Sequence, residues 1–229
     1  MSYTYGTALA GNGVRLHFMK TSPNNTTLNV IKNRVPASGF YGVNGGFFDL
    51  NNINTLLSIA VINDQPVNGI SGNYGSGWYN VWLPPQPARG TLVWDSITRR
   101  YSVPIINHAG EISVTSKSNY WAQGGISMKL PDDSGWSSQA ATEGIPGGLS
   151  HSARRTALVY NDQLNIWYVV TPTSCTPGQF RAAIKERIGS GTLVDGIFLD
   201  GGNSTQMKCA EFELSTSRNV TQMVATINI

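Results

Sequence analysis

Two segments of the chain combine an acid with paired glycines, directly adjacent in one and separated by two aromatic residues in the other, a combination that could bind an anion. One is GIFLDGGNST from Gly196 to Thr205, and the other is YGVNGGFFD from Tyr41 to Asp49. The apolar run before Asp200 predicts a buried strand, whereas paired glycines favour a turn or a close approach of the backbone to a ligand. A carboxylate, backbone N–H groups and hydroxyls at a strand end suit a ligand rich in hydroxyls or phosphate oxygens. A plain strand-to-turn exit is the alternative.

A third segment, ARRTALV from Ala153, puts two arginines at the start of an apolar strand. The planar guanidinium of arginine can bind two phosphate oxygens at once. A surface pair formed by Arg154 and Arg155 is the competing interpretation. Taken together, the three segments predict a site for an anionic, hydroxylated substrate.

In this order the three segments resemble the phosphodiester glycosidase family. The family pattern is an N-G-G-F-F element, a central R-T-A element and a late L-D-G-G-x-S-[ST] element, and here they read NGGFFD, RRTALVYND and FLDGGNSTQMK. Weaker echoes are the Gly124 and Gly125 pair and the closing SRNV. The resemblance spans Val14 to the C-terminus and implies cleavage of a sugar–phosphate diester. Asn203 stands where the family usually has a third glycine, so its side chain could narrow or re-aim the site.

The chemistry of such a diester suggests roles for these residues. A phosphate leaves the anomeric carbon readily, so the need for a general acid falls and the need for charge stabilisation rises. We predict Asp49, Asp200 and Arg155 as catalytic residues: the carboxylates as nucleophile or base and the arginine as phosphate clamp. Turn aspartates that bond their own backbone are the alternative for both acids. The predicted substrate-binding residues are Asn44, Gly45, Gly46, Gly201, Gly202, Asn203, Ser204, Thr205, Arg218 and His151.

The leading interpretation is therefore a hydrolase, a glycosidase that cuts the anomeric C–O bond of a phosphate-linked glycan or nucleotide-sugar-like substrate and needs no cofactor. One alternative is a phosphodiesterase that cuts P–O, with a divalent cation held by Asp49 and Asp200. Another is a non-catalytic carbohydrate- or nucleotide-binding module of a phage or cell surface. The sequence contains no CxxC or His-x-x-His spacing, so we do not predict a zinc site.

Composition narrows the class of protein. The chain of 229 residues is long enough for one core, so we expect a single domain over residues 1–229. Charged residues are only 13%, a balance common in extracellular and virion-surface β proteins. The net charge of +3, with no basic run longer than two residues, argues against a nucleic-acid partner. No apolar stretch reaches the ~20 residues of a membrane span, and the N-terminus shows no signal peptide. Bacterial or phage origin, and a cytoplasmic location, both fit.

The pattern along the chain predicts an α+β fold: a β-rich domain with a mixed sheet, few helices and long loops at the site. Thr176 and Gln179 have the spacing of a capping box, Pro177 suits the first turn of the helix that follows, and Gly189 and Gly191 end that helix. With the flanking strands this helix makes a βαβ unit, and a second helix is expected near residues 37–40.

Cys175 and Cys209 either pair or stay free. Long loops are expected at 63–89 and 132–152, a hairpin turn at 160–163, and strands at 14–19, 27–31, 56–62, 90–94, 112–115, 155–160, 165–170, 196–199 and 223–229.

Overall fold

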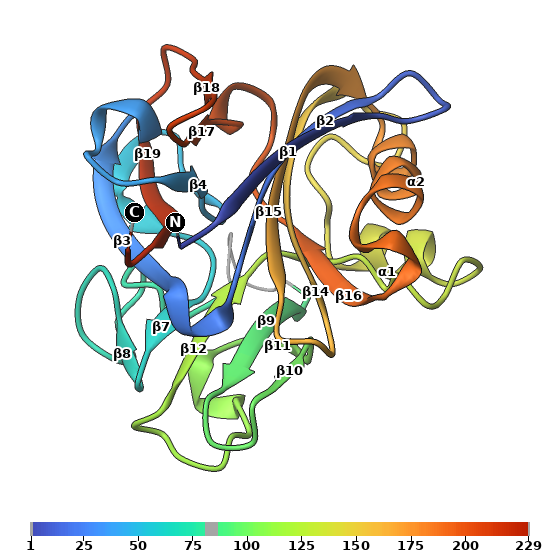
Figure 1. Cartoon of the computed structure of the whole chain (residues 1–229). Helices are drawn as coiled ribbons and strands as arrows, with labels where there is room; N and C mark the ends of the chain where they lie inside the picture. The colour runs from blue at the N-terminus through green and yellow to red at the C-terminus, as the bar shows by residue number, and fades with distance from the viewer. Residues whose placement is uncertain (1, 81–86, 229) are drawn as a thin grey trace.

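The computed structural model describes residues 2–80 and 87–228. These residues form a β-rich structure with three multi-stranded antiparallel sheets, one short hairpin and two α-helices, and the two ends of the described chain lie close together (Figure 1). No helix within the described residues is long and apolar enough to cross a membrane.

The first sheet has six strands and is covered by α2 on one face (Figure 1). Its order is β1 (Thr4–Leu9), β2 (Arg15–Thr21), β15 (Ile166–Cys175), β14 (Ala153–Asn161), β16 (Leu193–Phe198) and β13 (Ile126–Ser127). Side chains alternate along β14 and β15, so that each face of the sheet contributes to a separate apolar core. A sheet buried on both faces fixes its ends rigidly, and the site lies at one of these ends.

A second sheet contains β10 (Arg100–Ser102), β9 (Arg89–Asp95), β12 (Tyr120–Gly124), β7 (Ala60–Ile62) and β8 (Gln65–Pro66), with β11 (Ile105–Ile106) paired to β9. A third contains β18 (Glu213–Leu214), β17 (Met207–Lys208), β4 (Gly42–Asn44), β19 (Val220–Thr226) and β3 (Thr26–Asn33). The remaining hairpin joins β5 (Phe48–Asp49) to β6 (Asn52–Leu56). Tyr168 ties the first sheet to the third, because its hydroxyl bonds Thr26 Oγ1 at 2.8 Å and the carbonyl of Ala225 at 3.3 Å.

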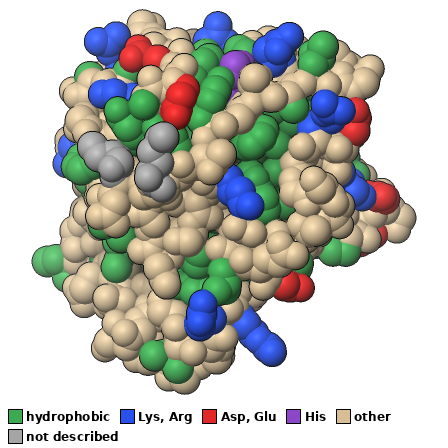
Figure 2. Space-filling view, in the orientation of Figure 1, with side chains coloured by type: hydrophobic (Ala, Val, Ile, Leu, Met, Phe, Trp, Pro, Cys, Tyr) green, Lys and Arg blue, Asp and Glu red, His purple; other side chains and the backbone are tan. Residues whose placement is uncertain are grey.

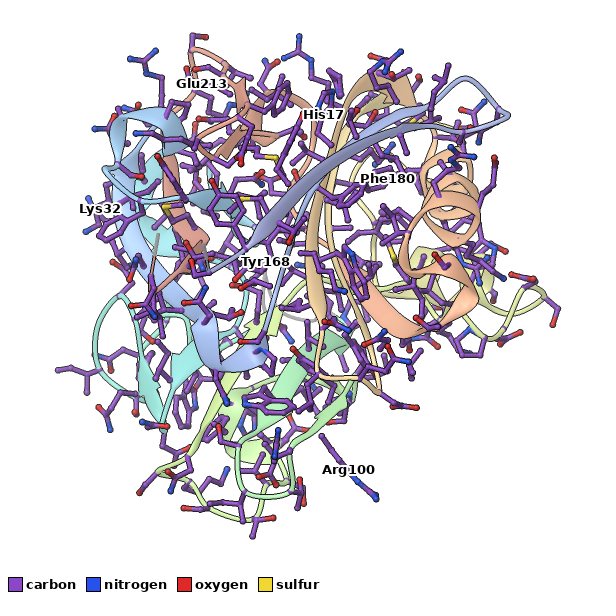
Figure 3. All side chains as sticks on the ribbon, viewed as in Figure 1. His17, Lys32, Arg100, Tyr168, Phe180 and Glu213 are labelled. Carbon is purple, nitrogen blue, oxygen red and sulfur yellow. The ribbon has the colours of Figure 1, made fainter. Side chains whose placement is uncertain are left out.

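The predicted helix is confirmed as α2 (Pro177–Arg187). Thr176 Oγ1 accepts from the Gln179 N–H, and Gln179 Oε1 accepts from the Thr176 N–H, which completes the capping box. Phe180 points from α2 into the core beside the first sheet (Figure 3). The β14–β15 hairpin is also confirmed, with its turn after Asn161.

The βαβ unit needs a correction. β15 and β16 run in the same direction, since both are antiparallel to β14, but β14 lies between them. The expected mixed sheet is therefore antiparallel in every pairing that the structure describes.

Several predicted elements differ from the structure. The strand at 112–115 is absent, because Ile112 caps the 3-10 turn Ala109–Glu111 instead. The helix near 37–40 is only a 3-10 turn, Val35–Ala37. The strand at 56–62 breaks between β6 and β7. The loop at 132–152 contains α1 (Trp136–Thr142), and that at 63–89 contains β8, while residues 81–86 lie outside the described part of the chain. Cys175 and Cys209 are buried and unpaired.

Candidate functional site

The two Gly-Gly segments meet, as their shared design predicts, although 156 residues separate Asn44 from Asp200. Asn44 Nδ2 donates to the Asp200 carbonyl at 2.8 Å, and the Asp200 N–H donates to the Gly45 carbonyl at 3.3 Å. The third segment joins them through Thr156, whose hydroxyl donates to Asn44 Oδ1 at 2.7 Å. All three motifs therefore converge at the end of the first sheet.

Asn44 lies at the centre of this junction and is 1% exposed. Besides Thr156, its Oδ1 accepts from the Gln206 N–H at 3.1 Å, and its Nδ2 also reaches the Gly45 carbonyl at 3.2 Å. A buried amide with donors and acceptor all engaged holds segments together. Asn44 therefore has a structural role, because its hydrogen bonds hold several segments together. Asn44 does not line the pocket described below.

Gly45 and Gly46 are equally enclosed. The Gly45 N–H donates to the Gln222 carbonyl at 2.8 Å, and the Gly46 N–H to Gln222 Oε1 at 3.3 Å. A Cβ on Gly45 would lie 1.7 Å from Gln222 Oε1, and one on Gly46 would lie 2.6 Å from Ser58 Cβ. These glycines let the backbone pack against side chains, and their N–H groups are occupied within the fold.

A pocket of about 150 Å³ opens beside the second Gly-Gly turn. One side is apolar, whereas Asp200, Arg155 and His151 bring ionisable groups to it. The lining residues are Phe47, Ile145, Pro146, Gly147, His151, Ala153, Arg155, Phe198, Leu199, Asp200, Gly201 and Gly202. Asp200, Arg155, His151, Gly201 and Gly202 were expected from the sequence, whereas the apolar members were not. Phe47 carried a signal, as the first aromatic of the NGGFF motif.

Asp200 is half-buried, and it is the single carboxylate among the described residues that line this pocket. Burial raises the pKa of its carboxyl to about 6. The Ser204 hydroxyl, the Gly201 N–H, which donates to Asp200 Oδ1 at 2.9 Å, and the charge of Arg218 act in the opposite direction on this pKa. A carboxyl with such a pKa can exchange protons near neutral pH.

Ser204 and Thr205 continue the turn after Asp200, and both are fully buried. Neither hydroxyl has a hydrogen-bond partner of ordinary geometry among the described residues, although Ser204 lies close enough to lower the pKa of Asp200. Leaving a buried hydroxyl unpaired costs about 1–3 kcal/mol. Such groups commonly mark a place for a bound water or ligand.

Arg155 begins the buried part of β14 and is 7% exposed. Its Nε donates to the Cys175 carbonyl at 3.0 Å, and its Nη2 donates to the His151 carbonyl. Desolvation lowers the pKa of the Arg155 guanidinium, while no carboxylate pairs with it in the described structure. A buried arginine bonded only to carbonyls keeps unneutralised positive charge at the pocket.

Arg218 lies on the adjoining loop, whereas Asn203 belongs to the 3-10 turn Gly202–Ser204 that follows Asp200. The Arg218 charge reaches Asp200, and its carbonyl accepts from Gln206 Nε2 at 2.8 Å. The Asn203 carbonyl accepts from Thr216 Oγ1 at 2.6 Å, which ties this loop to the Asp200 turn. The Asn203 side chain is exposed and outside the pocket lining, so it does not narrow the pocket.

Asp49 is not brought to the pocket. It ends the short strand β5, and its Oδ1 accepts from the Asn51 N–H at 2.9 Å, the bond of an Asx turn. The pocket lining thus holds one of the two predicted carboxylates. Within the described residues, no group of three or more His, Cys, Asp or Glu side chains is arranged to hold a metal ion.

The arrangement of strands has counterparts among solved structures. The catalytic domain of zebrafish N-acetylglucosamine-1-phosphodiester alpha-N-acetylglucosaminidase, auto-inhibited by its pro-peptide, superposes with a TM-score of 0.62 at 11% identity, over 98% of this chain and 81% of that one. A hypothetical protein from Synechocystis gives 0.54 at 14% identity, over 97% of this chain and 61% of that one. No protein-family model and no curated protein matches the sequence. At these identities the similarity establishes the fold alone, which this chain shares with both structures.

Proposed function

We propose that this protein is a glycosidase that hydrolyses the anomeric C–O bond of a sugar-1-phosphodiester. The observation that supports it best is the lone pocket carboxylate, Asp200, with its pKa near 6, beside the buried cation Arg155. The resemblance of the three motifs and the similarity of fold to a phosphodiester glycosidase point to the same substrate class.

One carboxylate is sufficient for this chemistry. Cleavage of an ordinary glycoside needs a second carboxylic acid to protonate the departing alcohol. A phosphate leaves as a stabilised anion, so cationic donors can replace that acid. Arg155 and Arg218 supply the positive charge here, and Asp49 lies outside the pocket. The second catalytic role predicted for Asp49 therefore has no geometric support.

The proposed step conserves atoms and charge. Ionised Asp200 accepts a proton from a water molecule, and the water oxygen bonds to the anomeric carbon as the bond from that carbon to the phosphate oxygen breaks. The electron pair of the broken bond stays on the phosphate, which leaves as a monoester anion facing the guanidinium groups. The buried Ser204 hydroxyl, which lies close enough to Asp200 to lower the pKa of its carboxyl, is placed to bond the same water.

The P–O-cleaving alternative, with a divalent ion shared by Asp49 and Asp200, is less well supported because these two side chains do not line a common pocket. A binding module without turnover would use the same pocket.

A basic surface for nucleic acid gains no support, since Lys and Arg side chains are scattered over the face in Figure 2. We propose a small-molecule or glycan partner that carries a phosphodiester.

Hydrolysis of a nucleotide-linked sugar phosphate in ¹⁸O-enriched water tests these alternatives. C–O cleavage places the label on the sugar, and P–O cleavage places it on the phosphate. Label on the phosphate would replace the glycosidase with a phosphodiesterase. Absence of turnover with retained binding of the same compound would favour the binding module.

A further inference from the structure

Residues 144–151 form one wall of the pocket, through Ile145, Pro146, Gly147 and His151. The backbone bonds of this segment are local: Ile145 N–H to the Ala140 carbonyl, Gly148 N–H to the Ile145 carbonyl, and His151 N–H to the Gly148 carbonyl. Gly144, Gly147 and Gly148 have positive φ of 73°, 76° and 77°, a region that favours glycine. A segment of this kind needs anchors elsewhere to keep its place.

One anchor is Glu143, which directly precedes the wall and is 0% exposed. Its Oε2 accepts from the N–H groups of Gly90 and Ser127, both at 2.8 Å. Its Oε1 accepts from Ser127 Oγ and from Gln139 Nε2, the latter at 3.0 Å. These bonds join the start of the wall to β9 and β13, in two different sheets. A fully buried carboxylate is stable only with such a set of donors.

The same residue is also linked to a second part of the pocket lining, Phe47. The Glu143 carbonyl accepts from Arg89 Nε at 3.0 Å, and the Arg89 guanidinium lies 5.2 Å over the ring of Phe47. Phe47 lines the same pocket as the wall. The far end of the wall is held by Arg155, through the His151 carbonyl. Glu143 thus fixes one end of the wall and, through Arg89, supports the aromatic residue Phe47 of the same pocket.

We propose that Glu143 is a positioning residue, which sets the width of the pocket by anchoring residues 144–151 and, through Arg89, Phe47. It touches no substrate. Its kinetic consequence rests on the proposed function, but its structural consequence does not. Loss of the anchor loosens the wall, weakens substrate binding and leaves the chemistry at Asp200 intact.

Hydrogen exchange and kinetics on Glu143→Ala test this role. We expect the amides of residues 144–151 to exchange at least tenfold faster, with β14 and β15 unchanged, and KM to rise about tenfold while kcat stays within twofold. Glu143→Gln should recover most of both properties, since its Oε1 can accept from Gly90 and Ser127 while Ser127 Oγ and Gln139 turn to accept. Glu186→Ala is the matched control, an exposed carboxylate that accepts from the Gly11 N–H at 3.1 Å.

Wild-type exchange of the wall in folded Glu143→Ala would overturn the proposal, as would faster exchange spread evenly over the whole sheet. If Glu143→Ala does not fold, Ser127→Ala provides the test, because it removes only one of the donors to Glu143. Faster exchange confined to residues 144–151 would support the proposal, and unchanged exchange there would refute it. A wild-type protein that hydrolyses no sugar phosphodiester would end the proposed function and leave the exchange result to decide the anchor.

Discussion

The two Gly-Gly turns have similar sequences but opposite relations to the pocket. Around Asn44 every polar group is used by the fold: the amide bonds four partners, and the glycine N–H groups bond Gln222. Around Asp200 the turn lines the pocket, the carboxyl has a raised pKa, and the buried Thr205 hydroxyl lacks a partner among the described residues. The two turns resemble each other in sequence, but only the Asp200 turn has polar groups that the fold leaves free to bind a ligand.

The largest effect should come from Asp200→Asn. We expect turnover to fall at least about a hundredfold, the scale of a lost acid–base group, while substrate binding remains. Because burial disfavours the charged form, the variant should also be more stable above pH 6, on the order of 1 kcal/mol. Steady-state kinetics beside thermal melting check both. A variant that melts earlier and loses rate only in proportion would make Asp200 structural as well.

The same raised pKa fixes the pH dependence. The folded-state value of about 6 lies above the ordinary value of 3.8, so the carboxyl stabilises the fold less as the pH rises from about 4 to 6. As a base it is active only when ionised. The kcat/KM of the wild type should therefore fall as the pH drops through about 6, and a pH profile flat from 5 to 8 would contradict the assignment.

Asn44→Ala tests the opposite turn. Removing a buried amide leaves the Gln206 N–H and the Thr156 hydroxyl without their acceptor, so we expect a loss of about 2–4 kcal/mol in unfolding free energy. Chemical denaturation measures it, with exposed Asn203→Ala as the control. Normal stability together with a selective loss of substrate affinity would return Asn44 to the binding role that its motif suggests.

Part of this contrast could be predicted from sequence, and part could not. The convergence of the turns followed from their shared design, and α2 followed from a capping box formed by neighbours in the chain. The partners of Asn44 could not be inferred, because Thr156 and Gln206 lie 112 and 162 residues away. Nor could local sequence reveal that Asp49 bonds its own turn while Asp200 faces a pocket.

The missed elements have the same cause. α1 reads WSSQAAT, has no side-chain cap and buries only Ala140, so nothing local marks it as a helix. Packing of Trp136 against Phe198 and under the Arg181 guanidinium holds it instead. The pocket wall, with its glycines and Glu143, likewise depends on contacts with distant strands.

Arg155→Lys should have an intermediate effect. Lysine keeps the charge but cannot hold the Cys175 and His151 carbonyls and still bind two phosphate oxygens. We expect kcat/KM to fall about tenfold or more with the fold intact. The neighbouring Arg154→Lys, which does not line the pocket, is the matched control. Wild-type turnover in Arg155→Lys would reduce this arginine to a source of general positive potential.

Ser204→Ala should have a smaller and more diagnostic effect. Its hydroxyl has no partner of ordinary geometry in the described structure, so its removal should leave the melting temperature unchanged or slightly higher. If the hydroxyl bonds the attacking water, turnover should nevertheless fall severalfold. A lower melting temperature would show that the hydroxyl is satisfied within the fold and that the Asp200 turn is closed like the Asn44 turn.

The smallest effect is expected from Asn203→Gly, which restores the third glycine of the family pattern. The Asn203 side chain is exposed and does not line the pocket, and its backbone carbonyl, which glycine retains, makes the bond to Thr216. Substrate affinity should therefore stay within about twofold, while added chain freedom in the unfolded state costs roughly 0.5–1 kcal/mol of stability. Isothermal titration and denaturant melts measure the two quantities. A large gain in affinity would mean that the Asn203 side chain restricts entry to the pocket. Access of substrate to Asp200 would then depend on that one side chain.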